Sequence, residues 1–212
     1  MTELPDIAFV NGIATVQGAS PELLHELLRV FDTELAAGGL PLADAFAPGL
    51  ERGVVEDALH AEGLAAPEEA IVWFGWHNGS AVRGQPIPNL VPVSLHDAVR
   101  IYHAITDERP PAGDDPDAWY AFAGPGWLRL GAETLDVALD CRSASESSLL
   151  RQPSYDFEEE SGKRQAKSLC TWVVWRILAL RNGAYGHFST SEWAWEFHPD
   201  LIDPTQVQAD FR

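Results

Sequence analysis

The stretch "PEEAIVWFGWHNG", residues 67 to 79, has the marks of a helix that ends in a turn. Pro67 suits the first turn of a helix, and the two glutamates after it lie at the positive end of the helix dipole. The apolar residues that follow are so dense that we expect the helix to be covered on more than one side. Asn78 and Gly79 come directly after the last apolar residue, where a left-handed helix cap is expected.

The same stretch has a second interpretation, in which His77 and Asn78 are working groups of a chemical site beside an aromatic wall. The cap explains both without chemistry. A histidine in the last turn interacts well with the negative end of the dipole, and asparagine tolerates the left-handed conformation. Trp73 and Trp76 lie three residues apart on one helix face, and such clusters are more often core than ligand cage. We therefore predict a structural cap and a dispensable His77.

The first 62 residues predict a hairpin followed by two helices. Residues 7–16, "IAFVNGIATV", place two apolar runs around an Asn-Gly turn signal. Residues 20–39 begin with Ser-Pro, carry leucines and a phenylalanine at helical spacing, and end in Gly-Gly. A second helix is predicted from about Leu50 to Glu62.

The second half of the chain predicts one short helix, several strands and a late helix. Ser94 and Asp97 give "SLHDAVRIYHAI" a capping-box-like start. The strand candidates are "AWYAFA", "WLRLG", "TLDVALD" and "SLLRQ", and the alternation in "TLDVALD" predicts a half-buried antiparallel strand. A helix that is apolar on most of its circumference is predicted in "AKSLCTWVVWRILALRNGAY", residues 166–185. The fold class is therefore α+β, an antiparallel meander packed against several helices.

Charge is the strongest global property of the chain. Fourteen Lys and Arg stand against 32 Asp and Glu, for a formal net charge of −18. A surface this negative repels phosphate backbones and anionic lipid, so we expect no nucleic-acid and no membrane partner, while a basic protein would be attracted. Solubility alone is the alternative explanation of such acidity. Two cysteines and the lack of a secretory pattern at the N-terminus indicate the cytoplasm.

Motifs of enzymes and metal sites do not occur in the sequence. It has no GxSxG, P-loop, GxGxxG or HExxH pattern, and its seven histidines are scattered. His96 and His103 are seven residues apart on one short helix, without a third ligand in reach by spacing. We therefore predict no catalytic residue, no metal and no cofactor. A small enzyme of another type is the least supported of the functional hypotheses.

The order of these signals resembles the SUKH superfamily of bacterial immunity proteins and their fungal cell-wall-regulator relatives. That family has a short helix ending in an aromatic residue, His or Asp, and Asn-Gly, then a Ser-Leu-Glu-Glu-like helix, then a helix ending Gly-x-Tyr. The matching residues are Trp76, His77, Asn78 and Gly79; Ser94, Leu95, Asp97 and Ala98; and Gly183 and Tyr185. The sequence "AWYAFAGPGWLRLGAE" replaces the glycine-rich aspartate step that the family has before its sheet.

The resemblance covers residues 50–185, about two-thirds of the chain. It implies an N-terminal extension of hairpin and helix over residues 1–49, and a Trp-rich tail over 186–212 that packs on the same domain. Family members are not known as enzymes, and many neutralise a cognate nuclease or deaminase toxin by tight binding. The resemblance thus implies an immunity protein, a monomer or weak dimer, that covers the basic active surface of a toxin. A regulatory or scaffold module is the alternative.

The predicted working surface combines acidic loops with aromatic anchors. Charge is concentrated in "GDDPD" and "DFEEE", which contain Asp114, Asp115, Asp117, Asp156, Glu158, Glu159 and Glu160. A single acidic loop of this kind is usually a solvated surface segment without a binding role. Trp193 and Trp195 are candidate anchors, since interface hot spots favour tryptophan ringed by polar groups. Their competing role is to cover the 168–181 helix.

Overall fold

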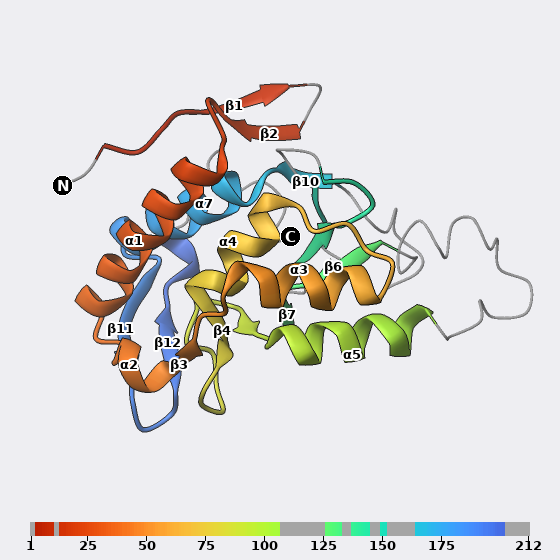
Figure 1. Cartoon of the computed structure of the whole chain (residues 1–212). Coiled ribbons are helices and arrows are strands. Elements are labelled where there is room, and N and C mark those ends of the chain that lie inside the picture. Colours follow the sequence, from red (N-terminus) through yellow and green to blue (C-terminus); the bar gives the residue numbers. More distant parts are fainter. Residues whose placement is uncertain are drawn as a thin grey trace, which may run out of the picture.

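A computed structural model describes most of the chain (Figure 1). The described residues are 3–10, 13–106, 126–132, 137–144, 149–151 and 164–201. The predicted strand "AWYAFA" and both predicted acidic loops lie outside them. In the described part of the chain, no helix is long and apolar enough to cross a membrane.

The central feature is a six-stranded sheet with the order β1-β2-β10-β9-β8-β6. Its strands are β1 (Ile7–Val10), β2 (Ile13–Val16), β6 (Trp127–Arg129), β8 (Ala138–Asp140), β9 (Leu149–Arg151) and β10 (Arg164–Lys167). β6, β8, β9 and β10 form an antiparallel meander, and the hairpin β1–β2 joins it through a parallel pairing of β2 with β10. The predicted hairpin, the meander and the α+β class are confirmed.

The strand β8 is covered more completely than its alternation predicts. Val137, Ala138 and Leu139 are all buried, and only Asp140 is partly exposed. Ala138 pairs with both neighbouring strands in the interior of the sheet. The prediction of a half-buried strand is therefore wrong here, because the face assigned to solvent carries a small apolar residue that is itself packed.

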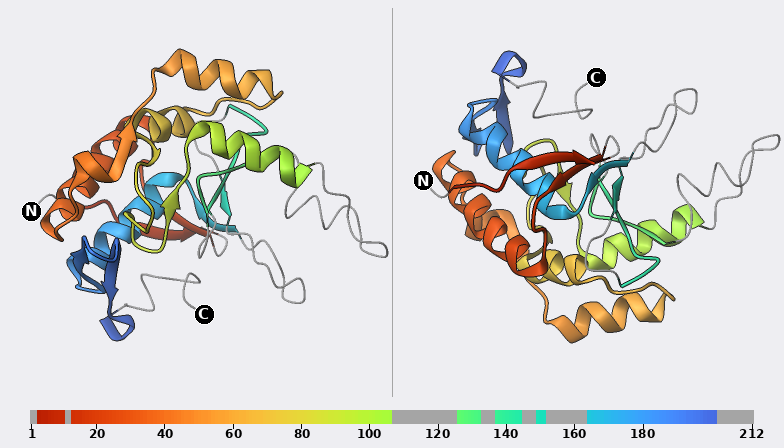
Figure 2. Two further views of the ribbon diagram at one scale, coloured as in Figure 1. Left: turned by 90° about the horizontal axis from the view of Figure 1, so that it is seen from below. Right: turned by 90° about the horizontal axis from the view of Figure 1, so that it is seen from above.

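The helices α1 (Pro21–Ala37) and α7 (Leu169–Arg181) lie against each other and form the centre of the core. The hydroxyl of Ser20 accepts a hydrogen bond from the Leu23 N–H at the start of α1, as predicted. The predicted stripe of α1 is fully buried: Leu24, Leu27, Leu28, Phe31 and Leu35. α7 is buried on nearly all sides, because α1 covers one flank and β2 and β10 lie on another (Figure 2). Helix 20–39 is thus part of the main core.

The start of α7 differs from the sequence prediction. Residues 164–167 form β10, and the helix begins only at Leu169, three residues after the predicted start at 166. Ala166 pairs with strands on both sides of it, so the sheet holds this segment extended. Ser168 has φ +113° and caps the helix by accepting the Cys170 N–H. The helix ends at Arg181, and Gly183 follows with φ +76°, as the Asn-Gly signal predicted.

Further helices surround this core. α4 (Glu68–Trp76) packs on α1, and α3 (Arg52–Ala61) lies on the outer side of α4 in both views of Figure 2. α5 (Leu95–Thr106) packs on β6. The remaining elements are α2 (Leu42–Ala45), the pair β3 (Phe46–Pro48) with β4 (His77–Ser80), the pair β5 (Val91–Pro92) with β7 (Gly131–Ala132), the hairpin β11 (Tyr185–Ser189) with β12 (Ala194–Phe197), and η1 (Pro199–Leu201).

Candidate functional site

The helix α4 ends earlier than the sequence predicts, and without a left-handed cap. Its last residue is Trp76, and His77 is already extended, with φ −145° and ψ 135°. The chain continues directly as β4, which pairs with β3. The predicted Asn78-Gly79 cap is therefore wrong, because the chain leaves the helix already at His77, which is extended and pairs with Pro48 of β3. The left-handed φ expected at Gly79 does occur, but within β4 and not at the end of α4.

Asn78 and Gly79 instead hold β4 against the start of α5. The Asn78 Oδ1 accepts a hydrogen bond of 2.8 Å from the Leu95 N–H, so it satisfies a free donor in the first turn of that helix. Gly79 has φ +85°, and a Cβ at this position would lie 2.5 Å from the Ser94 nitrogen. No side chain fits between the two backbones. The Ser94 hydroxyl accepts the Asp97 N–H, which confirms the predicted capping start.

His77 is oriented by Asp32 of α1. The His77 Nε2 lies 3.4 Å from Asp32 Oδ1, and the Trp76 Nε1–H donates to Asp32 Oδ2 at 2.9 Å. The imidazole also stacks on Phe46, with ring centroids 4.3 Å apart and planes 10° from parallel. One carboxylate thus joins α1 to the end of α4. The sequence pattern did not indicate Asp32 or Phe46, because both contacts are remote in the chain.

An aspartate and a histidine in contact can in principle move a proton, as in the pairs that activate a nucleophile. A histidine base acts on a nucleophile or substrate within hydrogen-bond reach. The described contacts of His77 are with Asp32, Phe46 and Trp76, and no serine, threonine or cysteine is among them. What this geometry provides is orientation and packing of the ring.

The cysteines and the metal-binding residue types form no reactive centre in the described ranges. Burial raises the pKa of the Cys141 thiol to about 12 and that of the Cys170 thiol to about 11. Both are therefore neutral thiols at physiological pH, not nucleophilic thiolates. Over the same described residues, no three His, Cys, Asp or Glu side chains come close enough together to hold a metal ion.

Among the described residues, the most deeply buried acidic side chain is Glu69, which is 1% exposed. Its oxygens accept hydrogen bonds from the Ser168 hydroxyl at 2.5 Å and from the Leu169 N–H at 3.2 Å. This places the carboxyl group at the start of α7, where it accepts from one of the free N–H groups of the first turn. Glu69 thus fixes the junction of α4 and α7. The sequence assigned it to the α4 dipole alone.

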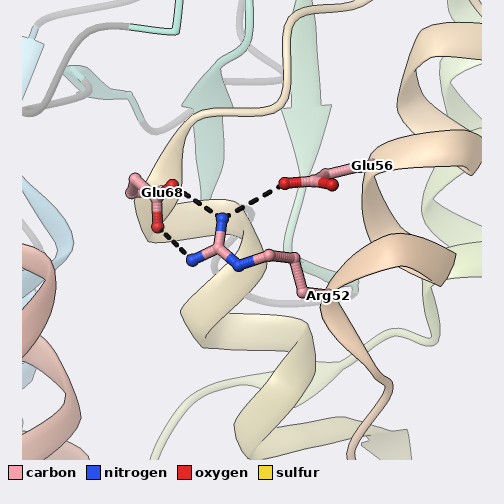
Figure 3. A network of polar contacts seen from close by, with 3 residues as sticks. All are labelled: Arg52, Glu56 and Glu68. Atoms are coloured by element: carbon pink, nitrogen blue, oxygen red, sulfur yellow. Dashed lines mark hydrogen bonds and ion pairs between the residues drawn. The ribbon is translucent and has the colours of Figure 1, made fainter.

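Arg52 binds two carboxylates at the outer surface of α3 and α4 (Figure 3). Its guanidinium donates to both oxygens of Glu68, at 2.7 and 2.6 Å, and to Glu56 at 3.1 Å. The hydrogen bonds from Arg52, together with its charge, hold the pKa of Glu68 below its ordinary value. The network lies in a strongly acidic part of the chain, since residues 1–106 contain fourteen Asp and Glu but four Arg and no Lys.

The predicted anchors Trp193 and Trp195 are both half-buried. Their rings lie 5.7 and 5.2 Å from the ring of Phe188. The Trp195 Nε1–H donates to the Pro86 carbonyl at 3.0 Å, and the indole lies directly against Gly38 at the end of α1. Trp195 therefore packs the β11–β12 hairpin onto α1 as well as onto residues at the end of α7. The predicted acidic residues, 114–117 and 156–160, lie outside the described residues.

The last motif piece, Gly183 and Tyr185, also makes contacts that hold elements together. Tyr185 is 3% exposed and its hydroxyl accepts a hydrogen bond of 2.7 Å from the Asn89 amide. Asn89 belongs to the loop between β4 and β5 and has a left-handed backbone, with φ +54°. The residues of the three motif pieces are thus brought to structural junctions, and they do not converge on one cleft of reacting groups.

A surface that sequence reasoning missed lies on the strand β1. Phe9 is 47% exposed and Val10 is 56% exposed, although both are large apolar residues in a sheet. The sequence signal was present, since "IAFV" carries no charge, but a hairpin assignment does not say which strand is at the edge.

Comparison with known proteins leaves the family open. No family model matches the chain, and no curated protein matches it significantly.

Proposed function

We propose that this protein is a toxin-neutralising immunity protein of the SUKH type, active in the cytoplasm. It binds a cognate nuclease or deaminase toxin and covers the basic surface with which that toxin holds nucleic acid. The observation that carries the proposal is the charge: 32 acidic against 14 basic residues, with the excess extending over the described N-terminal half. A toxin that grips phosphate is basic where it does so, and an acidic inhibitor is complementary to it.

The roles of the motif residues support a binding protein more than a catalyst. Asn78 and Gly79 hold α5, Tyr185 holds the loop at Asn89, and His77 is packed between Phe46 and the end of α4. These contacts build a scaffold. In such a protein the inhibitory work falls to surface charge and exposed apolar groups, which need no tuned acid or base.

Co-expression is the first test. The product of the gene next to this one is produced in a bacterial host with and without the chain, and growth is measured. Rescue of growth together with formation of a stable complex supports immunity. A stable complex with a non-toxic neighbour product favours the regulatory or scaffold module. The absence of both rescue and complex rejects neutralisation.

The electrostatic mechanism has a separate test in the association rate. Steered association slows with salt, because the Debye length falls from ~30 Å at 0.01 M to ~10 Å at 0.1 M ionic strength. Changing Glu158, Glu159 and Glu160 to Lys is expected to slow association by about tenfold or more at low salt, within the range that steering contributes.

A matched variant separates local charge from net charge. Glu22, Glu26 and Asp57 are exposed on α1 and α3 and are changed to Lys together. Both triple variants alter the net charge equally, so a larger effect of the 158–160 variant locates the binding charge there. If the association rate changes neither with salt nor in either triple variant, the electrostatic mechanism is contradicted.

A further inference from the structure

The strand β1 forms one end of the six-stranded sheet and lies at the upper rim of the molecule in Figure 1. Among the described residues, no strand pairs with its outer side. Proteins normally protect such edges with charges, proline or a covering segment, because unpaired backbone groups attract other strands. The sequence of β1 is "IAFV", with two of its apolar side chains about half exposed.

The pairing with β2 shows which backbone groups of β1 are available. Asp6 lies opposite Gln17 by the register, and the Gln17 N–H donates to the Asp6 carbonyl at 3.3 Å. In an antiparallel pair the hydrogen-bonding direction alternates, so Ala8 and Val10 also face β2. The N–H and C=O groups of Ile7 and Phe9 therefore point away from β2, toward the outer edge.

The side chains of the same two residues continue the covered face of the sheet. Ile7 lies opposite Val16 and Phe9 opposite Ala14, and these β2 partners are each 1% exposed. Ile7 is half-buried and packs on the core, as expected for that face. Phe9 projects from the same face but remains 47% exposed. The apolar face of the sheet thus continues onto the edge strand β1, where Phe9 is only partly covered.

We propose that an extended, basic segment of the partner protein adds to β1 as a further strand of the sheet. This inference rests on the proposed function and specifies where the partner docks. Backbone hydrogen bonds to Ile7 and Phe9 supply the pairing, and an apolar side chain of the incoming strand completes the face beside Phe9. Flanking Lys or Arg side chains of the segment meet Glu3 and Asp6, which precede β1.

The charge selects this occupant over a second copy of the chain. Two copies of the chain could also pair through β1 as antiparallel strands. Ile7 of each copy would then lie opposite Phe9 of the other, which is a self-complementary register. Each copy, however, carries a net charge of −18, and each brings Glu3 and Asp6 to the same short contact. Repulsion opposes that dimer, whereas the same carboxylates attract a basic strand.

Amide hydrogen exchange of the full chain, followed by NMR, tests the pairing residue by residue. In the free protein the Ala8 and Val10 amides are protected by β2, while those of Ile7 and Phe9 exchange fast. Binding of the toxin is expected to slow exchange at Ile7 and Phe9 by at least about tenfold. Unchanged exchange at both amides in the toxin complex overturns the proposal.

A pair of variants tests the apolar contact against charge alone. Phe9→Glu removes the ring and adds a negative charge, and Val54→Glu adds the same charge at a valine on α3 that is 51% exposed. Strand docking predicts at least about tenfold weaker binding for Phe9→Glu and binding within about twofold of the wild type for Val54→Glu. If charge alone governs binding, neither variant weakens it. Retained protection of Ala8 and Val10 shows that the variant hairpin is folded.

Short peptides make failure of this proposal distinguishable from failure of the immunity function. A peptide alternating valine and lysine is expected to protect Ile7 and Phe9, and its valine–glutamate counterpart is not. If the lysine peptide slows exchange at the Ile7 and Phe9 amides but the chain binds no toxin, docking at β1 is supported and the immunity function is rejected. If the toxin binds while the Ile7 and Phe9 amides still exchange fast, docking at β1 is rejected and the proposed immunity function is not. Protection that rises with protein concentration alone shows self-association, which also overturns the proposal.

Discussion

Replacing Gly79 by alanine tests the contact between β4 and the start of α5. A Cβ at Gly79 would lie 2.5 Å from the Ser94 nitrogen and 2.8 Å from the Val93 carbonyl carbon. Both are backbone atoms, so the contact is relieved only if the backbone just before α5 shifts. The φ of +85° adds strain, since a side chain is poorly tolerated in the left-handed region.

Two terms give the expected size of the effect. Left-handed strain costs about 1–2 kcal/mol for a non-glycine residue, and overpacking against a rigid neighbour costs typically about 1–3 kcal/mol. Gly79→Ala should therefore lower the free energy of unfolding by about 2–5 kcal/mol. For a chain of this size that corresponds to a fall in melting temperature of roughly 4–20 °C.

Two other glycines separate these terms. Gly63 has φ +71°, and a Cβ added there would have no atom within 4 Å, so Gly63→Ala should show the strain alone, about 1 kcal/mol. Gly53 is in α3 with open space around it, and Gly53→Ala should stabilise by up to about 1 kcal/mol. Urea unfolding followed by circular dichroism measures all three. If Gly79→Ala costs no more than Gly63→Ala, the close approach to α5 is refuted.

The remaining predictions concern the neighbouring motif residues and the two thiols. Asn78→Ala removes the acceptor for the Leu95 N–H and should destabilise by about 0.5–2 kcal/mol in urea unfolding, whereas Asn78→Asp keeps an acceptor and should cost less. His77→Gln should retain binding of the proposed partner within a few-fold by titration calorimetry, and a loss of all binding with an intact fold would revive a chemical role. Cys141 and Cys170 should react slowly with a disulfide reagent at pH 8 and rapidly in denaturant, because burial raises their pKa values to about 12 and 11. Since the unfolded thiols ionise first, stability should be unaffected well below pH 9 and should fall as the pH rises above it.

Local signals predicted the elements whose ends are fixed by local contacts. Ser20 needed only the next turn of α1, and the structure confirms its cap. The Ser94 start of α5 and the glycine after α7 were found for the same reason. Each of these residues makes its decisive contact within three or four positions along the chain.

Predictions failed where a partner from elsewhere in the chain decides the backbone. The Asn78-Gly79 pair has the composition of a helix cap, but β3 pairs with His77 and Ser80 on either side of it and keeps the pair within β4. Ala166 resembles the first residue of a helix, but β2 and β9 hold it in the sheet. The aspartate that orients His77 is 45 positions away in the chain. Composition alone could not decide between helix and strand at these positions, because each outcome depends on a tertiary contact.

The separation between scaffold and surface has a consequence for how such a protein acquires a partner. Asn78, Gly79 and Tyr185 are bound to other elements of the chain, so changing them costs stability. Exposed carboxylates such as Glu22 on α1 have no such role in the described contacts, and substitutions of that kind usually change stability by less than about 0.5 kcal/mol. The surface charge, and with it the complementarity to the proposed basic partner, can therefore be altered one residue at a time while the junctions at α5 and at the end of α7 stay intact. The proposed immunity function requires that independence, because affinity for a toxin would be set by the surface charges and the fold by the buried junctions.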